Sequence, residues 1–279
     1  MTTGEALKKA VTLLDGAQVP SAAVDARELL ASLLLRPPLA ILATPDTPLA
    51  REEEARFFAL VRRRMAREPL QYILGSAPFM GQLFLTSPGV LIPRQDTEAL
   101  CARAIALAKP RARVLDLCCG SGCLAVSLKL ARPDTEVHAG DLAQEAVALT
   151  QENASRLGAD ISVRRGDLFD PFIGLRFDLV LSNPPYIPSG ELPGLQAEVR
   201  FEPALALDGG ADGLHVYRRI LYRAGDFLAP GGSLLLEVGD RLAEPLAALV
   251  KDGWAAPRIH PDLAGLPRVL ETQRTGGVE

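Results

Sequence analysis

The sequence predicts an α/β fold, in which a small helical domain precedes an open and mostly parallel β-sheet. Up to about residue 72, apolar residues recur only at helical spacing. From residue 111 onward, β-prone segments alternate with helical ones, which is typical of a parallel sheet covered by helices on both faces. The chain has 279 residues, of which 48% are hydrophobic, and this suits two unequal domains with separate cores.

Residues 1–72 are expected to form helices over GEALKKAVTLLDGA, SAAVDARELLASLLL and TPLAREEEARFFALVRRRMARE. Ser21 is the expected N-cap of the second helix, whereas Thr47 and Pro48 are the expected N-cap and first residue of the third. The basic end of the third helix, VRRRMAR, allows two interpretations. It is either a solvated face that complements the helix dipole or a contact for a partner or RNA.

A β-hairpin linker is expected over residues 73–95, because Gly and Pro interrupt short β-prone pieces there. Helical spacing then returns in RQDTEALCARAIALAK. The expected domains are therefore a helical domain over 1–72, a hairpin linker over 73–95 and an α/β domain over 96–279.

The α/β domain carries the alternating pattern. Strands are expected in RVLDLCCG, TEVHAGD, ISVRRGD, FDLVLSN and GSLLLEVG. Helices are expected in CLAVSLKLAR, QEAVALTQENASRLG, ADGLHVYRRILYRAGDFL and EPLAALVKDG, and a closing pair of strands in RIHPDLAGLPRVLETQR.

Composition argues against several functional classes. The formal net charge of −4 disfavours electrostatic binding of nucleic acid by the chain as a whole. No run of 18 apolar residues predicts a membrane span, and MTTGEALKKA lacks the apolar stretch of a secretory signal, so a cytoplasmic location is expected. Three of the four cysteines crowd into DLCCGSGC without a nearby histidine or fourth thiol. We expect packed thiols there, and neither a disulfide framework nor a metal site.

A glycine loop follows the first strand of the α/β domain, in VLDLCCGSGCLAV. Gly120 and Gly122 permit a ligand to approach the backbone closely, just before the next helix begins. A nicotinamide dinucleotide enzyme usually has a third glycine at the start of that helix, where this sequence has GCLA. The pattern therefore favours a mononucleoside ligand without phosphate, and S-adenosylmethionine fits.

Two acidic residues end the following strands. Asp141 ends the second strand, where a carboxylate can accept the hydrogens of both ribose hydroxyls, although an N-cap for the next helix is the alternative. Asp167 ends the third strand. Either this acid or the backbone beside it at Leu168 can contact an adenine amino group, and the alternative is a turn before Pro171.

The fourth strand ends in LSNPPYIPS, beside the first strand at the switch point of the sheet. The side-chain oxygen of Asn183 and the backbone carbonyls of Pro184 and Pro185 are hydrogen-bond acceptors. The prolines fix the backbone, and Tyr186 supplies a flat face. Such a loop can hold a planar NH₂ group, either a carboxamide or the exocyclic amine of a base, and aim its nitrogen at the methyl of a sulfonium donor.

Over nearly its whole length the chain resembles the bacterial release-factor glutamine N5-methyltransferases. The resemblance rests on REPLQYILG, VLIPRQDTE, LDLCCGSG, the strand end at Asp141, NPPYIP, VRFEPALAL and LLLEVG. It implies a class I S-adenosylmethionine-dependent methyltransferase fold, with a Rossmann-like seven-stranded sheet behind an N-terminal helical domain that recognises the substrate.

The resemblance also implies an activity and a site. A methyl group passes from S-adenosylmethionine, with S-adenosylhomocysteine as product, to the glutamine of the Gly-Gly-Gln motif in class 1 peptide chain release factors. The glutamine amide is bound by residues 183–186. The implied donor contacts are Cys118, Cys119, Gly120, Ser121, Gly122, Asp141, Leu168 and Asn183. A monomer without a DNA or membrane partner is expected.

Two departures from the family pattern stand out. Cys118-Cys119 replaces the usual Gly-Thr, so that a Cβ at residue 118 limits the approach of the methionine part of the donor, and Gln95 replaces a proline. Three alternatives stay open: glutamine methylation of another protein such as a ribosomal protein, adenine-N6 methylation of DNA or RNA, and a binding module without activity.

Overall fold

The structure, a computed structural model, describes residues 1–275. It contains two compact units. The helical unit consists of residues 1–76 together with 196–201, and the sheet unit consists of residues 77–195 together with the described part of 202–279. Segment 196–201 therefore belongs to the helical unit, although the residues on either side of it belong to the sheet unit.

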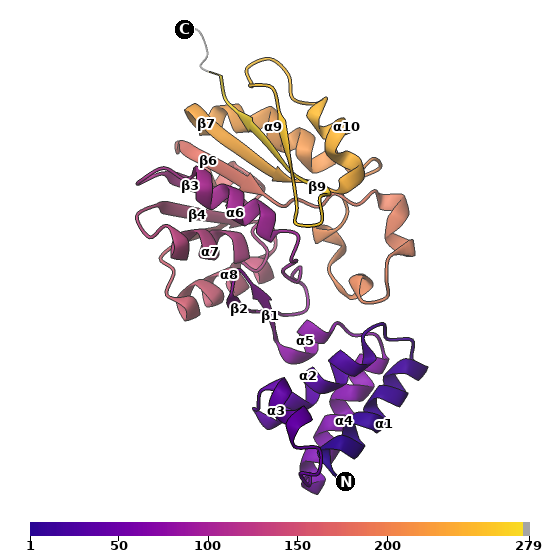
Figure 1. Ribbon diagram of the computed structural model, residues 1–279. Helices are drawn as coiled ribbons and strands as arrows, with labels where there is room; N and C mark the ends of the chain where they lie inside the picture. The colour runs from indigo at the N-terminus through magenta and orange to yellow at the C-terminus, as the bar shows by residue number, and fades with distance from the viewer. Residues whose placement is uncertain (276–279) are drawn as a thin grey trace. The chain divides into compact units, whose positions relative to one another are not determined.

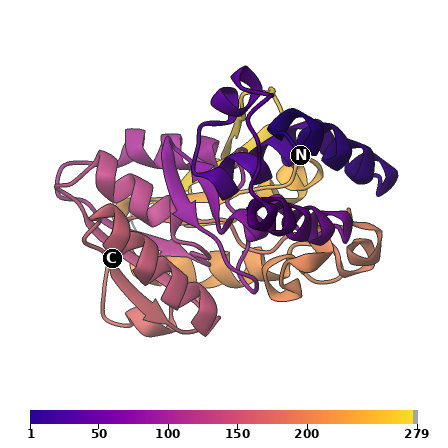
Figure 2. The same cartoon turned by 90° about the horizontal axis from the view of Figure 1, so that it is seen from below.

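The helical unit is a bundle of helices with one apolar core (Figures 1 and 2). The helices are α1 Thr3–Gly16, α2 Ala22–Leu34, α3 Pro38–Ala43, α4 Arg51–Met65 and α5 Leu70–Leu74. Leu14, Leu30 and Phe57 lie in this core and are fully buried. Ser21 occupies the N-cap position of α2, but its side chain makes no capping hydrogen bond. The sequence pattern missed α3 and α5, because six and five residues are too few to show helical periodicity.

The third predicted helix begins later than expected. Thr47 and Pro48 lie outside α4, which begins at Arg51, and Pro48 takes part in an isolated β-bridge instead. The backbone N–H of Ala50 donates to the Glu53 carboxylate at 2.8 Å. The acidic first turn thus satisfies the helix start, and the threonine–proline pair that predicted the start at residue 47 was misleading.

At the basic end of α4, Arg64 is neither part of a solvated face nor exposed for a contact with a partner or RNA. Arg64 is buried, and its guanidinium donates to Asp25 at 2.7 Å and to Glu198 at 2.8 Å. Arg67 binds both carboxylate oxygens of Glu198, at 2.7 and 2.6 Å. These hydrogen bonds lower the pKa of Glu198 to about 2. Segment 196–201 is thereby attached to α4 through paired charges.

The expected hairpin, β1 Ser76–Phe79 and β2 Gln82–Leu85, lies in the sheet unit except for Ser76, and α6 Glu98–Leu107 follows. The remaining elements are β3 Arg113–Leu117, α7 Cys123–Ala131, β4 Glu136–Asp141, α8 Gln144–Leu157, β5 Ser162–Arg165, β6 Phe177–Ser182, α9 His215–Phe227, β7 Leu228–Glu237, α10 Ala243–Ala247, β8 Arg258–Pro261 and β9 Pro267–Gln273. Short 3-10 helices are η1 Asp170–Phe172, η2 Ser189–Gly194, η3 Val199–Phe201, η4 Ala204–Ala206 and η5 Asp240–Leu242.

In the described part of the chain, the large sheet has seven strands in the order β5-β4-β3-β6-β7-β9-β8. Neighbouring strands are parallel from β5 to β7, whereas β9 runs antiparallel to both β7 and β8. This confirms the predicted parallel sheet, its closing pair of strands and the place of β6 beside β3.

Helices cover both faces of the sheet (Figure 1). Helices α6, α7 and α8 pack on one face, where Val114 of β3 and Leu124 of α7 share a core. Helices α9 and α10 pack on the other, where Leu115 and Tyr217 are fully buried. The last predicted helix is shorter than EPLAALVKDG, because beyond Ala247 the chain continues in turns with hydrogen bonds between residues three apart. No helix within residues 1–275 has both the length and the apolarity to cross a membrane.

Candidate active site

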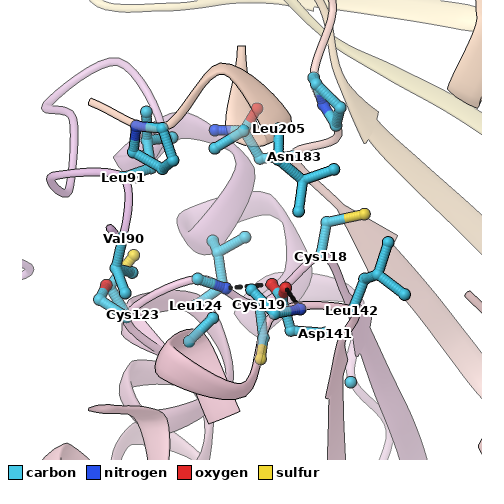
Figure 3. Close-up of a pocket in the computed structure, with 18 of the residues that line it drawn as sticks. Val90, Leu91, Cys118, Cys119, Cys123, Leu124, Asp141, Leu142, Asn183 and Leu205 are labelled. Atoms are coloured by element: carbon cyan, nitrogen blue, oxygen red, sulfur yellow. Dashed lines mark hydrogen bonds between the residues drawn. The ribbon is translucent and has the colours of Figure 1, made fainter. Parts of the chain in front are cut away.

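A cavity lies at the carboxyl ends of β3, β4 and β6 (Figure 3). Strands β3 and β6 are neighbours, but the helices that follow them, α7 and α9, cover opposite faces of the sheet. Loops after such strands diverge and leave a crevice between them. Nine predicted site residues line the cavity: Cys118, Cys119, Gly120, Ser121, Asp141, Asp167, Leu168, Asn183 and Pro185. Gly122, Pro184 and Tyr186 lie outside its lining.

The two glycines of the loop after β3 have different requirements. Both have positive φ, 56° at Gly120 and 78° at Gly122. A Cβ at Gly122 would lie 2.7 Å from the Thr150 side chain, so this position needs glycine in order to pack against α8. A Cβ at Gly120 would meet only Val90, at 3.9 Å. The space beside the Gly120 backbone is therefore open to a ligand.

Cys118 and Cys119 point in different directions (Figure 3). Cys118 lines the cavity and has a φ of 58°, a left-handed conformation that a residue with a Cβ rarely adopts. The Cys119 sulfur lies 3.4 Å from the hydroxyl oxygen of Thr150, on the side away from the cavity centre. Burial raises the pKa of both thiols. Both are therefore neutral and are not nucleophiles at physiological pH.

Asp141 connects the end of β4 to the glycine loop. One carboxylate oxygen accepts the N–H of Gly120 and the other that of Ala143, both at 2.9 Å. Asp141 is not the N-cap of α8, since Ala143 occupies that position. Burial raises the pKa of Asp141, although the backbone hydrogen bonds oppose the shift. Each oxygen keeps a lone pair that can accept a further hydrogen from a ligand hydroxyl.

Asp116 lies in β3, just before the glycine loop, and was not predicted from the sequence. It is fully buried in β3, and one of its carboxylate oxygens accepts the N–H of Ala125 at 3.2 Å. The other oxygen has no partner within the described residues. Burial raises the pKa of Asp116 to about 8. An acidic residue within the apolar strand VLDL was the available signal.

Asp167 lies at the cavity margin with its carboxylate already engaged. The Arg219 guanidinium donates to it at 2.6 Å, and the Asp167 side chain is 41% exposed. Leu168 follows with a φ of 48° and also lines the cavity. Strand β5 ends at Arg165, before the end that was expected at Asp167. Of the two predicted donor contacts after this strand, the backbone at Leu168 is therefore the group without a charged partner.

Asn183 follows β6, and its side-chain amide has a defined orientation. Its Nδ2 donates to the Thr97 hydroxyl oxygen at 3.2 Å. The Oδ1 atom is therefore the end left for a ligand. Pro184 is buried, and the Tyr186 ring packs beside Gly239, where a Cβ would come within 3.4 Å of two ring carbons. Burial raises the pKa of Tyr186 to about 12, so the phenol stays neutral.

A second segment, residues 207–213, packs against the NPPY loop, which consists of residues 183–186. The N–H of Ile187 donates to the Leu207 carbonyl at 2.9 Å, and the N–H of Gly209 donates to the Ile187 carbonyl at 2.8 Å. A Cβ at Gly209 would lie 2.6 Å from the Tyr186 Cα, and a Cβ at Gly213 would overlap the Tyr186 carbonyl. The helix expected from Ala211 begins only at His215, and the three glycines in LDGGADGL are instead a signal of close backbone packing.

Glu202 anchors another part of the lining. It is 6% exposed, accepts the N–H of Ile92 at 3.0 Å and pairs with Arg94. Residues 92–94 lie just before α6 and line the cavity. The part of the cavity lining formed by residues 92–94 is thus connected to the segment that follows residue 201.

Solved structures share the fold of this chain. A methyltransferase from Pyrococcus furiosus matches with a TM-score of 0.55 and 16% identity, covering 81% of this chain and 100% of that one. The 16S rRNA N2 methyltransferase (RsmC) from T. thermophilus, in complex with AdoMet and guanosine, matches with a TM-score of 0.52 and 22% identity, over 71% and 49% of the two chains. These likenesses confirm the class I methyltransferase fold.

Family models and curated relatives cover most of the chain. The PrmC N-terminal domain matches residues 5–75, and the methyltransferase small domain matches residues 95–194. A release factor glutamine methyltransferase of Geobacter sulfurreducens is 43% identical over 254 residues, covering 90% of this chain and 89% of the relative. Its counterpart in Deinococcus radiodurans is 40% identical over 282 residues, covering 99% and 100%. With such identity over nearly its full length, the chain belongs to the release factor glutamine methyltransferase family.

Proposed function

We propose that this chain transfers a methyl group from S-adenosylmethionine to the side-chain amide nitrogen of the glutamine in the Gly-Gly-Gln motif of class 1 release factors, and so modulates translation termination. The orientation of Asn183 carries the proposal. Because Thr97 accepts from its Nδ2, the Oδ1 of Asn183 is left to accept a hydrogen from a substrate NH₂ group.

The residues of the cavity fit the proposed donor. Asp141 keeps lone pairs for the two ribose hydroxyls, and the Leu168 backbone is the group we assign to the adenine, since the Asp167 carboxylate binds Arg219. The methionine part is assigned to the open space beside Gly120 and Cys118. When bound, S-adenosylmethionine supplies an electrophilic methyl group on a positively charged sulfur.

The NPPY loop is the proposed holder of the substrate amide. Asn183 Oδ1 and the backbone carbonyl of Pro184 accept the two amide hydrogens, while Pro184 and Pro185 keep the loop rigid. We assign Tyr186 as the aromatic face of this loop. A carboxamide nitrogen is a weak nucleophile because its lone pair is delocalised, so these residues act mainly by orienting it. The displaced amide proton leaves to solvent after the transfer, and no general base is assigned.

Labelled S-adenosylmethionine tests the function with a purified class 1 release factor, in its natural form and with the Gly-Gly-Gln glutamine replaced by alanine. We expect label in the natural factor only. Label in both factors would place the methyl group on another residue. If neither is labelled although donor binding is detected by calorimetry, the partner is wrong, and ribosomal proteins and nucleic acid become the substrates to test.

The domain roles are part of the same proposal. Residues 1–72 recognise the release factor, residues 73–95 are a linker, and residues 96–279 bind the donor and carry out the transfer. We further propose that the protein acts in the cytoplasm as a monomer, which light scattering during gel filtration tests directly.

A further inference from the structure

Thr97 occupies the N-cap position of α6 without capping the helix. Threonine at this position commonly accepts an N–H of the first turn, but the side chain of Thr97 makes no such hydrogen bond. The residue is only 3% exposed and lines the cavity. Its hydroxyl is therefore used for something other than the start of the helix.

The hydroxyl of Thr97 instead stands between two other side chains. Its oxygen accepts the Nδ2 hydrogen of Asn183 at 3.2 Å. The same side chain lies near the carboxyl of Glu237 at the end of β7, where it opposes the rise in the pKa of Glu237 that burial causes. A lone pair of the Thr97 oxygen therefore faces Asn183, which leaves the single hydroxyl hydrogen free for an acceptor on another side. Thr97 thus lies between Asn183, which donates to it, and the buried Glu237.

Glu237 is held firmly near Thr97. It is 1% exposed, and its backbone carbonyl accepts the Tyr217 hydroxyl at 2.6 Å. Its second carboxylate oxygen has no partner within residues 1–275. An acidic side chain that is buried at a cost, with one oxygen unsatisfied, needs a role that an apolar residue could not fill.

We propose that Thr97 is a positioning residue that fixes the rotation of the Asn183 side chain, so that Oδ1 and not Nδ2 faces the substrate. This inference rests on the proposed function, since it concerns the amide that Asn183 binds there. The two ends of an asparagine amide have nearly the same shape, so only their hydrogen-bond partners select one orientation. A reversed Asn183 would direct N–H donors at the donors of the substrate NH₂ group.

The test compares two substitutions of Thr97 with the wild-type protein. Thr97→Val keeps the shape but removes the hydroxyl, whereas Thr97→Ser keeps the hydroxyl and removes a methyl group. The turnover number is measured at saturating donor and release factor, and the donor Kd by calorimetry. Thr272→Val is the matched control, because Thr272 is also buried and its hydroxyl donates to the Ala255 carbonyl at 2.8 Å, away from the cavity lining.

We expect Thr97→Val to lower kcat about ten- to a hundredfold, the range for a lost hydrogen bond that leaves a polar group unpaired. Thr97→Ser should stay within about threefold of the wild type, and the donor Kd should change little in either variant. Thr272→Val should keep its kcat. Inactive wild-type protein would refute the proposed function itself.

Two results would overturn the inference while leaving the proposed function intact. One is a wild-type kcat in Thr97→Val. The other is an equal loss in the valine and serine variants, which would assign the effect to packing. If the valine variant fails to bind the donor, Thr97→Ala replaces it. Loss of donor binding in both would make Thr97 a structural residue and also overturn the assignment.

Discussion

The glycine loop over residues 118–122 and the NPPY loop over residues 183–186 follow neighbouring parallel strands, yet they are held in different ways. The glycine loop is fixed by the next strand and helix, through Asp141 and Thr150. The NPPY loop is fixed by parts of the chain on both sides of it: Thr97 before it, and residues 207–213 after it.

This difference separates the two tasks of the site. The donor loop belongs to a unit of β-strand, helix and strand, whose contacts lie within about one supersecondary motif. The substrate loop is held instead by Thr97 and by residues 207–213, which come from other parts of the chain. Changes around the glycine loop should therefore alter donor affinity, whereas changes around the NPPY loop should alter turnover.

Asn183→Ala should give the largest effect. Removing the amide takes away the acceptor that orients the substrate nitrogen, and we expect kcat to fall about a thousandfold, within the range for lost positioning. Donor Kd should change by less than about threefold, since the loss of one contact at the cavity margin is small. Transfer assays and calorimetry measure the two quantities. Retention of a tenth of the activity would contradict the role of Asn183.

Gly213→Ala should impair turnover without a change at the catalytic residues. The new Cβ would overlap the Tyr186 carbonyl and displace the NPPY loop, so we expect kcat to fall about ten- to a hundredfold, as a misplaced reacting group does. Gly174→Ala is the matched control, because Gly174 has a φ of 86° and no atom within 4 Å of the added Cβ. Equal losses in both variants would show that backbone strain, and not the overlap, is responsible.

Asp141→Asn should mainly weaken donor binding. An asparagine can accept only one of the two N–H groups that Asp141 now holds, so we expect the donor Kd to rise about tenfold, the usual size for one hydrogen bond to a charged group. Turnover at saturating donor should stay near that of the wild type. Asp134→Asn is the control, since Asp134 also accepts a loop N–H, from Arg111, outside the cavity lining. A fall in kcat with unchanged Kd would break the division between the two loops.

Asp116 should make stability depend on pH. Its pKa rises from 3.8 to about 8 on folding, so between these values the folded state binds more protons than the unfolded state. Stability should therefore fall as pH rises through this window, by at most about 1.4 kcal/mol per pH unit for one group. The free energy of unfolding, measured with urea at pH 5 to 8, should depend less steeply on pH in Asp116→Asn than in the wild type. Asp178→Asn is the control, because Asp178 is an exposed acceptor of the Arg113 N–H. An equal pH dependence of the unfolding free energy in Asp116→Asn and the wild type would contradict the raised pKa of Asp116.

Cys118→Gly should give the smallest effect. Glycine adopts the φ of 58° without strain, so we expect a gain in stability of about 1 kcal/mol at most and a donor Kd that tightens by less than about threefold. Arg111→Gly, at a φ of 59° away from the cavity lining, should give a similar gain in stability without a change in Kd. Weaker donor binding in Cys118→Gly would mean that the thiol contributes to the donor site.

The sequence predicted those parts of the fold that depend on neighbours in the chain. The alternation of strands and helices, the hairpin and the turns after β3 and β6 each follow from local pattern. The predicted start of α4 was wrong because Thr47-Pro48 resembles a helix start. The N–H group at the true start is instead bound by Glu53 from within the helix. Arg64 could not be distinguished from a solvated arginine, since its partners Asp25 and Glu198 lie 39 and 134 residues away.

The site shows the same division. Asp141 and Asn183 are found from the sequence because each ends a strand at the edge where ligands bind. Thr97 resembles an ordinary N-cap, and only the folded chain brings its hydroxyl to Asn183. Gly213 was expected in a helix, and the contact of Gly209 and Gly213 with Tyr186 depends on the path of the whole loop.

Segment 196–201 has a consequence for how the protein can be cut or recombined. The chain passes between its two units after residues 76, 195 and 201, and Glu198 completes the charge pairing of α4. A fragment ending at residue 76 would leave the buried Arg64 with Asp25 as its only carboxylate partner. The helical unit is therefore not a module that one splice could exchange between relatives. A functional chimera has to inherit two separate stretches of sequence from the same parent.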